Sequence, residues 1–374
     1  VMTQNIGAGR PGVAYQARQL GLAFNAVLGV IMSLFLSLGA GTILSGVGVA
    51  DALMQPAKTY LQIVGGFCIL NALIPICSSY LRAFGFSKEP LYASIIGNVI
   101  NFCLNAFFLF VLHKGVAGVA TATVISRIIN LVIVVLLGAV LVKAKQHPER
   151  ESNRAVMGQI IRIGLPSACE TAIYNVSMTL VIRFLNQMDA QGLNVTARSY
   201  TMQITNFSYC VGAALAQANA IMTGWHIGAK EYDACDRGTK KAAVIGVIVA
   251  VILETVFTLC SGWIMQLFSK DPQMVSLVGK LLAIDIVLEI GRVTNLVYGQ
   301  ALKTSGDAVF PVVMGACFMI LCSVGGTYLF GIRLGLLAVG AYIGMTGDEC
   351  VRAVGMYLRW KSGKWKEKGL VKSR

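Results

Sequence analysis

The chain has 374 residues, of which 56% are hydrophobic and only 13% are charged. Soluble globular proteins carry about 25% charged residues, so this chain has too few charges to cover a water-facing surface. The formal net charge is +14, but the basic residues stand in short loops and a tail, which indicates membrane topology rather than nucleic-acid binding. We therefore expect a polytopic membrane protein whose partner is the lipid bilayer and not nucleic acid.

Ten apolar segments are long enough to cross a membrane core, which takes about 20 residues. Five have almost no charge: Leu20–Leu44, Thr59–Leu81, Leu91–Leu112, Ser199–Gly224 and Ala308–Ile332. Five more contain ionisable residues: Gly115–Val142, Ile163–Gln187, Ala242–Phe268, Leu281–Leu302 and Leu334–Leu358. Lipid offers the backbone no hydrogen bonds, and the segments are too long and too uniformly apolar for barrel strands, so we expect α-helices.

The basic residues predict the orientation of these spans. If the C-terminal tail is cytoplasmic, 21 of the 31 lysines and arginines lie on the cytoplasmic side, and the outside loops keep only a few, such as Lys58 and Lys114. The positive-inside rule therefore predicts a cytoplasmic C-terminus and, with ten spans, a cytoplasmic start of this chain.

Short motifs recur at a shift of 220 to 221 residues. They pair Met2-Thr3 with Met222-Thr223, Ile6-Gly7-Ala8 with Ile227-Gly228-Ala229, the set Arg82, Gly85 and Pro90 with Lys303, Gly306 and Pro311, and Gly115 and Val119 with Gly335 and Val339. A single shift that places odd spans on odd spans indicates parallel repeats. The second repeat has two helices before its Met-Thr motif that the first repeat lacks.

The fold class that follows is an all-α polytopic membrane protein of two parallel-repeat six-helix bundles, with ten of twelve transmembrane helices present. We expect a chain truncated at its N-terminus. The predicted parts are an N-terminal bundle over 1–142 that lacks its first two helices, a cytoplasmic linker over 143–157, a C-terminal six-helix bundle over 158–358 and a basic cytoplasmic tail over 359–374.

Ionisable residues inside the spans are the first candidates for function, because each costs about 2.5–3.5 kcal/mol on insertion scales unless it pairs or meets water. Asp285, Glu289 and Arg292 fall at i, i+4 and i+7 on one helix face, with Asn295 close beside them. A carboxylate pair can bind a cation or share a proton, and Arg292 could hold one carboxylate in an intrahelical pair. The alternative is a purely structural seam of ion pairs.

Glu170 is the second candidate acid, and it follows Pro166 by four residues. Proline is tolerated at a helix start, so we expect Glu170 just over one turn into its helix, with Tyr174 on the same face. We interpret Glu170 as a proton or cation site across a cavity from Asp285 or Glu289. The alternative is a carboxylate near the interface that stabilises the positive end of its helix.

Two polar stripes in the first bundle could also face a cavity. They consist of Asn98, Asn101 and Asn105 on one helix, and of Thr123, Arg127 and Asn130 on the next. Helix–helix hydrogen bonding is the alternative for the asparagines, and Arg127 could pair with an acid on the helices absent from this chain. Two further candidates lie in the second bundle: Glu254 as a functional acid, and a structural cluster of Asp348, Glu349 and Arg352.

Several strings occur in a characteristic order. They are Arg82-Ala83-Phe84-Gly85 with Pro90, Gly115-Val116-Ala117-Gly118-Val119-Ala120, Ile163-Gly164-Leu165-Pro166-Ser167, Gly306-Asp307 with Pro311, and Asp348-Glu349 with Arg352. In this order and on this hydropathy, nearly the whole chain resembles the multidrug and toxic compound extrusion (MATE) family. It departs from the family at Phe86, where Asp is common, and at Arg127, where Gln is common.

The resemblance implies two bundles facing a central cavity and exchange of organic cations or other amphiphiles for protons or sodium ions. The chain has no nucleotide-binding motif, so energy would come from an ion gradient. We expect a secondary antiporter in the plasma membrane, a monomer and not an enzyme. Its partners would be a small-molecule substrate and the bilayer, with no metal site and no cofactor besides the coupling ion, H⁺ or Na⁺.

Three other functions fit the sequence less well. A lipid-linked oligosaccharide flippase of a related branch would want a wider cationic cavity than two embedded arginines, Arg127 and Arg292, supply. A membrane-embedded enzyme would need a cluster of His, Ser or Asp near the interface. A passive channel would not need duplicated bundles with offset acids.

Overall fold

The computed structural model describes residues 1–47, 49–143, 147–188 and 192–371. Over these ranges the structure is helical and contains no strand, which confirms the all-α fold class. Residues 144–146 of the predicted linker and 372–374 of the predicted tail lie outside the described residues. The chain divides into two compact units, Val1–Ile160 and Ile161–Arg374.

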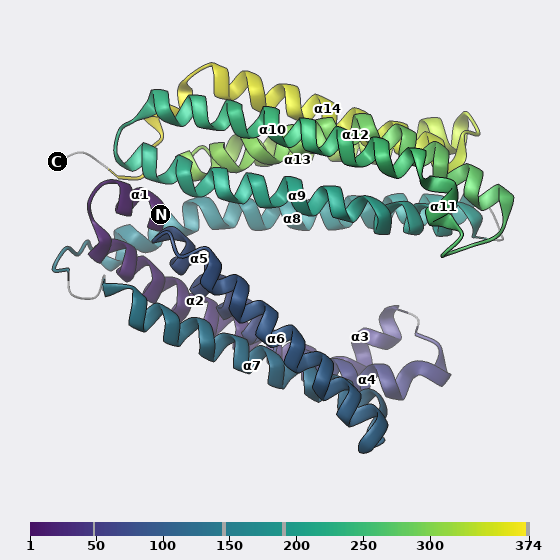
Figure 1. Ribbon diagram of the computed structural model, residues 1–374, viewed down its shortest axis with the longest axis horizontal. Coiled ribbons are helices and arrows are strands. Elements are labelled where there is room, and N and C mark those ends of the chain that lie inside the picture. The colour runs from purple at the N-terminus through teal and green to yellow at the C-terminus, as the bar shows by residue number, and fades with distance from the viewer. Residues whose placement is uncertain (48, 144–146, 189–191, 372–374) are drawn as a thin grey trace. The chain divides into compact units, whose positions relative to one another are not determined.

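The first unit is a group of long helices joined by short turns (Figure 1). Its helices are α1 (Met2–Gly7), α2 (Pro11–Leu38), α3 (Ala40–Val47), α4 (Asp51–Gly66), α5 (Ile69–Ala83), α6 (Lys88–Ala106), the π-helical turn η1 (Phe107–Val111) and α7 (Gly115–Leu141). Helices α4 and α5 bend by 42° at their junction. The Ile69 amide at this break donates to the Ser33 hydroxyl at 3.2 Å, which satisfies a backbone group that the broken helix leaves free.

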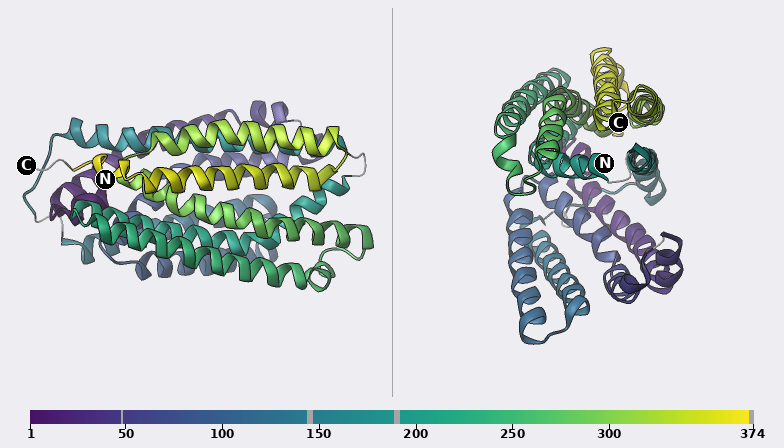
Figure 2. Two further views of the ribbon diagram at one scale, coloured as in Figure 1. Left: turned by 90° about the horizontal axis from the view of Figure 1, so that it is seen from above. Right: turned by 90° about the vertical axis from the view of Figure 1, so that its right-hand side faces the viewer.

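The second unit is built from longer helices that lie side by side (Figure 2). They are α8 (Asn153–Met188), α9 (Leu193–Gly228), α10 (Tyr232–Leu259), α11 (Ser261–Met265), α12 (Pro272–Ser305), α13 (Val309–Phe318), the π-helical segments η3 (Met319–Val324) and η4 (Thr327–Arg333), α14 (Leu337–Lys361) and the 3₁₀ turn η5 (Lys364–Glu367). The first residues of α8 belong to the first unit.

Each of the ten predicted spans falls on helical residues. Among the described residues, five helices are long and apolar enough to cross a membrane by length and composition, or six if the bent pair α4–α5 is one span. The helices α8, α9, α12 and α14 are also long, from 25 to 36 residues, but they carry more polar and charged side chains. These polar helices contain most of the candidate site residues.

The start of α8 differs from the prediction. We expected the helix to begin near Pro166, but it begins at Asn153, inside the predicted linker, and Pro166 lies in its interior. The segment before it docks on α2: Gln16 donates to the Glu151 carbonyl at 2.7 Å and to the Asn153 side chain at 2.6 Å. These contacts extend the helix backwards, so Glu170 lies far from the helix end and cannot stabilise its dipole.

The predicted repeat recurs in the backbone. Positive φ angles occur at Gly85 and Gly306, which are 221 residues apart, and at Gly115 and Gly335, which are 220 apart. A left-handed backbone conformation is favourable for glycine, because glycine has no Cβ atom to clash with the backbone there. The π-helical η1 and η4 precede the second pair of glycines in the same way, so the two units share local geometry as well as motifs.

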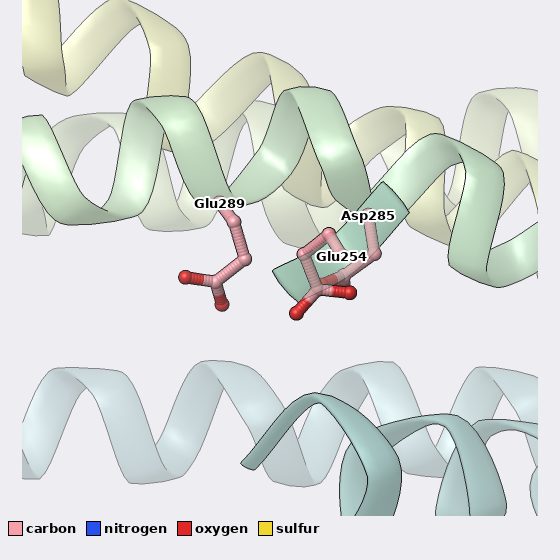
Figure 3. Close-up of side chains that lie close together, drawn as sticks. All are labelled: Glu254, Asp285 and Glu289. Atoms are coloured by element: carbon pink, nitrogen blue, oxygen red, sulfur yellow. The ribbon is translucent and has the colours of Figure 1, made fainter. Parts of the chain in front are cut away.

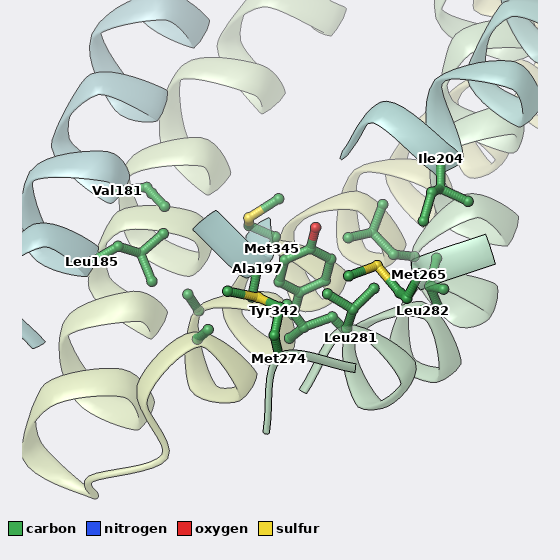
Figure 4. Close-up of a cluster of buried hydrophobic side chains, with 14 residues drawn as sticks. Val181, Leu185, Ala197, Ile204, Met265, Met274, Leu281, Leu282, Tyr342 and Met345 are labelled. Atoms are coloured by element: carbon green, nitrogen blue, oxygen red, sulfur yellow. The ribbon is translucent and has the colours of Figure 1, made fainter. Parts of the chain in front are cut away.

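The second unit has a dense core at one end (Figure 4). Leu281 and Leu282 of α12 pack with Tyr342 of α14, and Val181 and Leu185 of α8 join the same buried cluster. Burying side chains of this size contributes about 1.5–3 kcal/mol each in water, but in lipid the gain comes mainly from close packing. The core fixes α12 against α14, which carry the charged residues described below.

Gly291 lets α12 and α14 approach closely. A Cβ at this buried position would lie 2.9 Å from the backbone of both Glu349 and Cys350. We therefore expect Gly291→Ala to destabilise the protein by about 1–3 kcal/mol, because backbone atoms cannot move aside as a flexible side chain can.

The measurement is the thermal unfolding of the purified protein in detergent. Gly347→Ala is the matched control, because a Cβ there meets nothing within 4 Å and alanine favours a helix. An equal melting temperature for the Gly291 variant and the wild type would contradict this account of the packing.

Candidate functional site

Three acids from two helices meet in the second unit (Figure 3). Asp285 and Glu289 are one helical turn apart on α12, and Glu254 comes from α10. One carboxyl oxygen from each lies within 4.8 Å of the others, and all three residues are at most 2% exposed. We call Glu254, Asp285 and Glu289 the acidic cluster.

The acidic cluster has unused acceptors. Both oxygens of Glu254, one of Asp285 and one of Glu289 accept no hydrogen bond from the described residues. Buried charges of one sign at this separation repel strongly, and an unpaired buried polar atom is costly. The arrangement therefore favours binding of protons or of a cation that reduces the negative charge.

Arg292 connects the acidic cluster to a second group of acids. Its Nη1 donates to Glu289 Oε1, so the predicted intrahelical pair forms with Glu289. Its Nε lies 3.8 Å from Glu349 Oε1 on α14. The Arg292 guanidinium also lies 6.0 Å from the centre of the Tyr209 ring.

The second group of acids is closed by Arg352. This guanidinium binds Asp348 through two bonds, at 2.8 and 2.9 Å, and lies 2.9 Å from Glu349. Asn295 Nδ2 donates to Glu349 at 3.0 Å, and Ser323 donates to Asp348 at 3.0 Å. Every acid here has a partner, in contrast to the acidic cluster.

The charges of the two groups do not balance. Five carboxyl groups, those of Glu254, Asp285, Glu289, Asp348 and Glu349, stand against the guanidiniums of Arg292 and Arg352 among the described residues of this network. The larger excess of acid lies in the acidic cluster, because three carboxyl groups stand against Arg292 there, whereas two stand against Arg352 in the second group. A proton or a hard cation that prefers oxygen ligands fits such a set of donors.

A pocket of about 490 Å³ opens beside Arg292. Glu170, Tyr174, Arg292 and Asn295 line it, so four of the predicted residues meet in one place. Asp285 and Glu289 are not among its lining residues, but Glu289 binds Arg292, which lines the pocket. Glu170 was expected to face these acids across a cavity, but it instead pairs with Lys303 at 2.5 Å.

The candidates in the first unit are placed differently. Asn101 donates to Ser126 of α7 at 3.3 Å, which is helix–helix hydrogen bonding, and it accepts from Asn105 of its own helix α6 at 3.1 Å. Asn98 is exposed, and the half-buried Arg127 has no hydrogen-bond or ion-pair partner among the described residues. The structure gathers none of these residues into a described pocket.

The MatE family model matches residues 1–107 and 166–329 of the chain. The chain belongs to the MATE family. It is 32% identical over 377 residues to "Uncharacterized transporter YisQ" of Bacillus subtilis, covering 99% of this chain and 82% of that protein. It is 22% identical over 362 residues to "Probable multidrug resistance protein NorM" of Thermotoga maritima, covering 91% and 76%.

The fold of this MATE protein also matches a solved structure. The match to "Crystal structure of MATE in the straight conformation" has a TM-score of 0.87 at 19% identity and covers 98% of this chain and 82% of that chain. As a MATE protein, the chain is a multi-pass membrane transporter and, at the level of the family, not an enzyme.

Sequence reasoning underrated two residues of the site. Glu254 is a single acid in an apolar span, and only the packing of α10 on α12 brings it to Asp285 and Glu289. Lys303 was noted only as part of a repeated motif, although it lies in the last turn of α12 and pairs with Glu170. A lone acid inside an apolar span is a sequence signal that could have identified Glu254 as a site residue. The sequence contains no comparable signal for Lys303.

Proposed function

We propose that the chain is a secondary antiporter, which exports small organic molecules of cationic or amphiphilic character in exchange for H⁺ or Na⁺ by alternating access. The observation that carries the proposal is the acidic cluster, with its four carboxyl oxygens that accept no hydrogen bond from the described residues. Arg292 binds Glu289 of the acidic cluster and also lines a pocket of the size that drug-like molecules occupy, so the same arginine can respond to the ion and to the substrate.

Arg292 supplies a route for competition between ion and substrate. With the acidic cluster ionised, Glu289 offsets the charge of Arg292, and a cationic group can occupy the pocket. When a proton or Na⁺ neutralises Glu289, Arg292 regains its positive field at the pocket and disfavours a bound cation. Binding of the ion thus promotes release of the substrate, which is the sign that antiport requires.

The experiment is uptake of xanthene dyes by proteoliposomes of the whole chain. Rhodamine 123 and rhodamine 110 are supplied outside, and the vesicle interior is made acidic or loaded with sodium. We expect one of the two outward gradients to drive dye accumulation and its dissipation to stop it. Equal accumulation with and without both gradients, by vesicles that do take up dye, would show a uniporter and overturn the proposal.

We also propose that the chain acts as a monomer in the plasma membrane with its C-terminus in the cytoplasm. The excess of lysine and arginine in the predicted cytoplasmic segments supports this orientation. Protease cleavage of the basic tail in right-side-out and inverted vesicles tests it, with cleavage expected only in inverted ones.

A further inference from the structure

The ion pair between Glu170 and Lys303 stands apart from the other charges of the pocket. Lys303 Nζ lies 2.5 Å from Glu170 Oε2, and both side chains are 17% exposed. Among the described residues, neither group has a second ion-pair partner. Arg292 and Arg352, in contrast, each contact two carboxylates, so among the described residues that line the pocket the Glu170–Lys303 contact is the ion pair made by two groups alone.

The pair joins two helices across the pocket. Glu170 comes from the middle of α8 and Lys303 from the last turn of α12, and both line the same cavity. A solute in this cavity can therefore contact a carboxylate and an ammonium group that are paired with each other. Tyr174 and Tyr209 also line it, and aromatic side chains favour contact with a flat aromatic solute.

We propose that this pocket selects solutes that carry both a cationic and an anionic group, and that such a solute replaces the Glu170–Lys303 pair with one contact to each residue. The inference rests on the proposed function and specifies its substrate class. A solute that carries only a cationic group would pair with Glu170 and leave Lys303 without a partner in a partly buried site. A solute with an anion alone would leave Glu170 unpaired, whereas a zwitterion satisfies both groups.

The test uses three dyes with one ring system and different charge. Rhodamine 110 carries a cationic ring and a free carboxylate, rhodamine 123 is its methyl ester and a simple cation, and fluorescein is an anion. Binding to the purified full chain in nanodiscs is followed by fluorescence anisotropy at equilibrium and without any gradient. We expect the wild type to bind rhodamine 110 about tenfold more tightly than either of the others.

Two substitutions should change the preference in opposite directions. Lys303→Met should weaken the binding of rhodamine 110 by about tenfold, because the carboxylate of the dye loses its partner. The binding of rhodamine 123 should stay equal or become tighter, because Glu170 becomes free to pair with a cation. Glu170→Gln should strengthen the binding of fluorescein relative to the binding of rhodamine 123. Lys361→Met, at an exposed position near the end of α14, should change none of the three affinities.

The results separate this inference from the proposed function. If Lys303→Met and Glu170→Gln both keep the wild-type order of affinities, the zwitterion inference is wrong, whatever the gradient experiments give. If the order changes as expected but no gradient drives uptake, the antiport proposal fails and the selectivity stands. Should one variant not fold, the other decides the matter alone, because each predicts its own sign of change.

Discussion

Replacing Glu289 with glutamine should lower gradient-driven dye uptake by about tenfold or more, to nearly the level seen without a gradient. Glutamine keeps the size of the side chain but can neither titrate nor hold a cation by charge. Arg292 would also lose its partner in α12, and its field at the pocket would no longer depend on the ion. The measurement is dye uptake by proteoliposomes under the gradient that drives the wild type.

Equilibrium binding of a cationic dye is expected to weaken in this variant and to lose its dependence on the ion, because neutral glutamine leaves the charge of Arg292 at the pocket without its partner. The matched control is Glu231→Gln, since the Glu231 side chain is 59% exposed in the turn before α10 and lies outside the acidic cluster. Gradient-driven uptake by Glu289→Gln at the wild-type rate would remove the acidic cluster from the coupling mechanism.

Replacing Arg352 with leucine should destabilise the protein by about 3–5 kcal/mol, the largest effect on folding that we expect from one substitution. Arg352 is 4% exposed and binds both Asp348 and Glu349. Leucine would leave two carboxylates buried next to each other, with Arg292 as the remaining cation at 3.8 Å from Glu349. The loss should appear as a low yield of monodisperse protein and a lower melting temperature in detergent.

Two further variants define the cause. Arg352→Lys keeps the charge but cannot form the two-bond contact with Asp348, so an intermediate loss is expected. Arg333→Leu, at an exposed residue, serves as the control for removal of an arginine. If Arg352→Leu melts with the wild type, the Asp348–Glu349–Arg352 group does not stabilise the fold.

The parts of the site that lie on one helix were predictable. Asp285, Glu289 and Arg292 share a face of α12 because the helical period is 3.6 residues, and the contact between Glu289 and Arg292 follows from their spacing. The same spacing places Asp348 beside Arg352 on α14. Contacts along one helix can therefore be predicted from residue spacing alone.

The start of α8 was not predictable from local signals. Pro166 resembles the first residue of a helix, but the helix begins at Asn153 because Gln16 binds the preceding segment. Val156 adds an apolar contact by packing with Val13 and Ala17 of α2. These partners are about 140 residues away, and no pattern within the linker reveals them.

The sequence by itself determined that this is a helical membrane protein with two related halves, since hydropathy, charge asymmetry and the repeated motifs are properties of single segments. Only the tertiary structure decided which charges meet. Glu254 joins Asp285 because α10 packs on α12, and Glu170 meets Lys303 because both reach into one pocket. Contacts between helices depend on how closely the backbones approach, and that distance is set by small residues such as Gly291 rather than by the charged residues themselves.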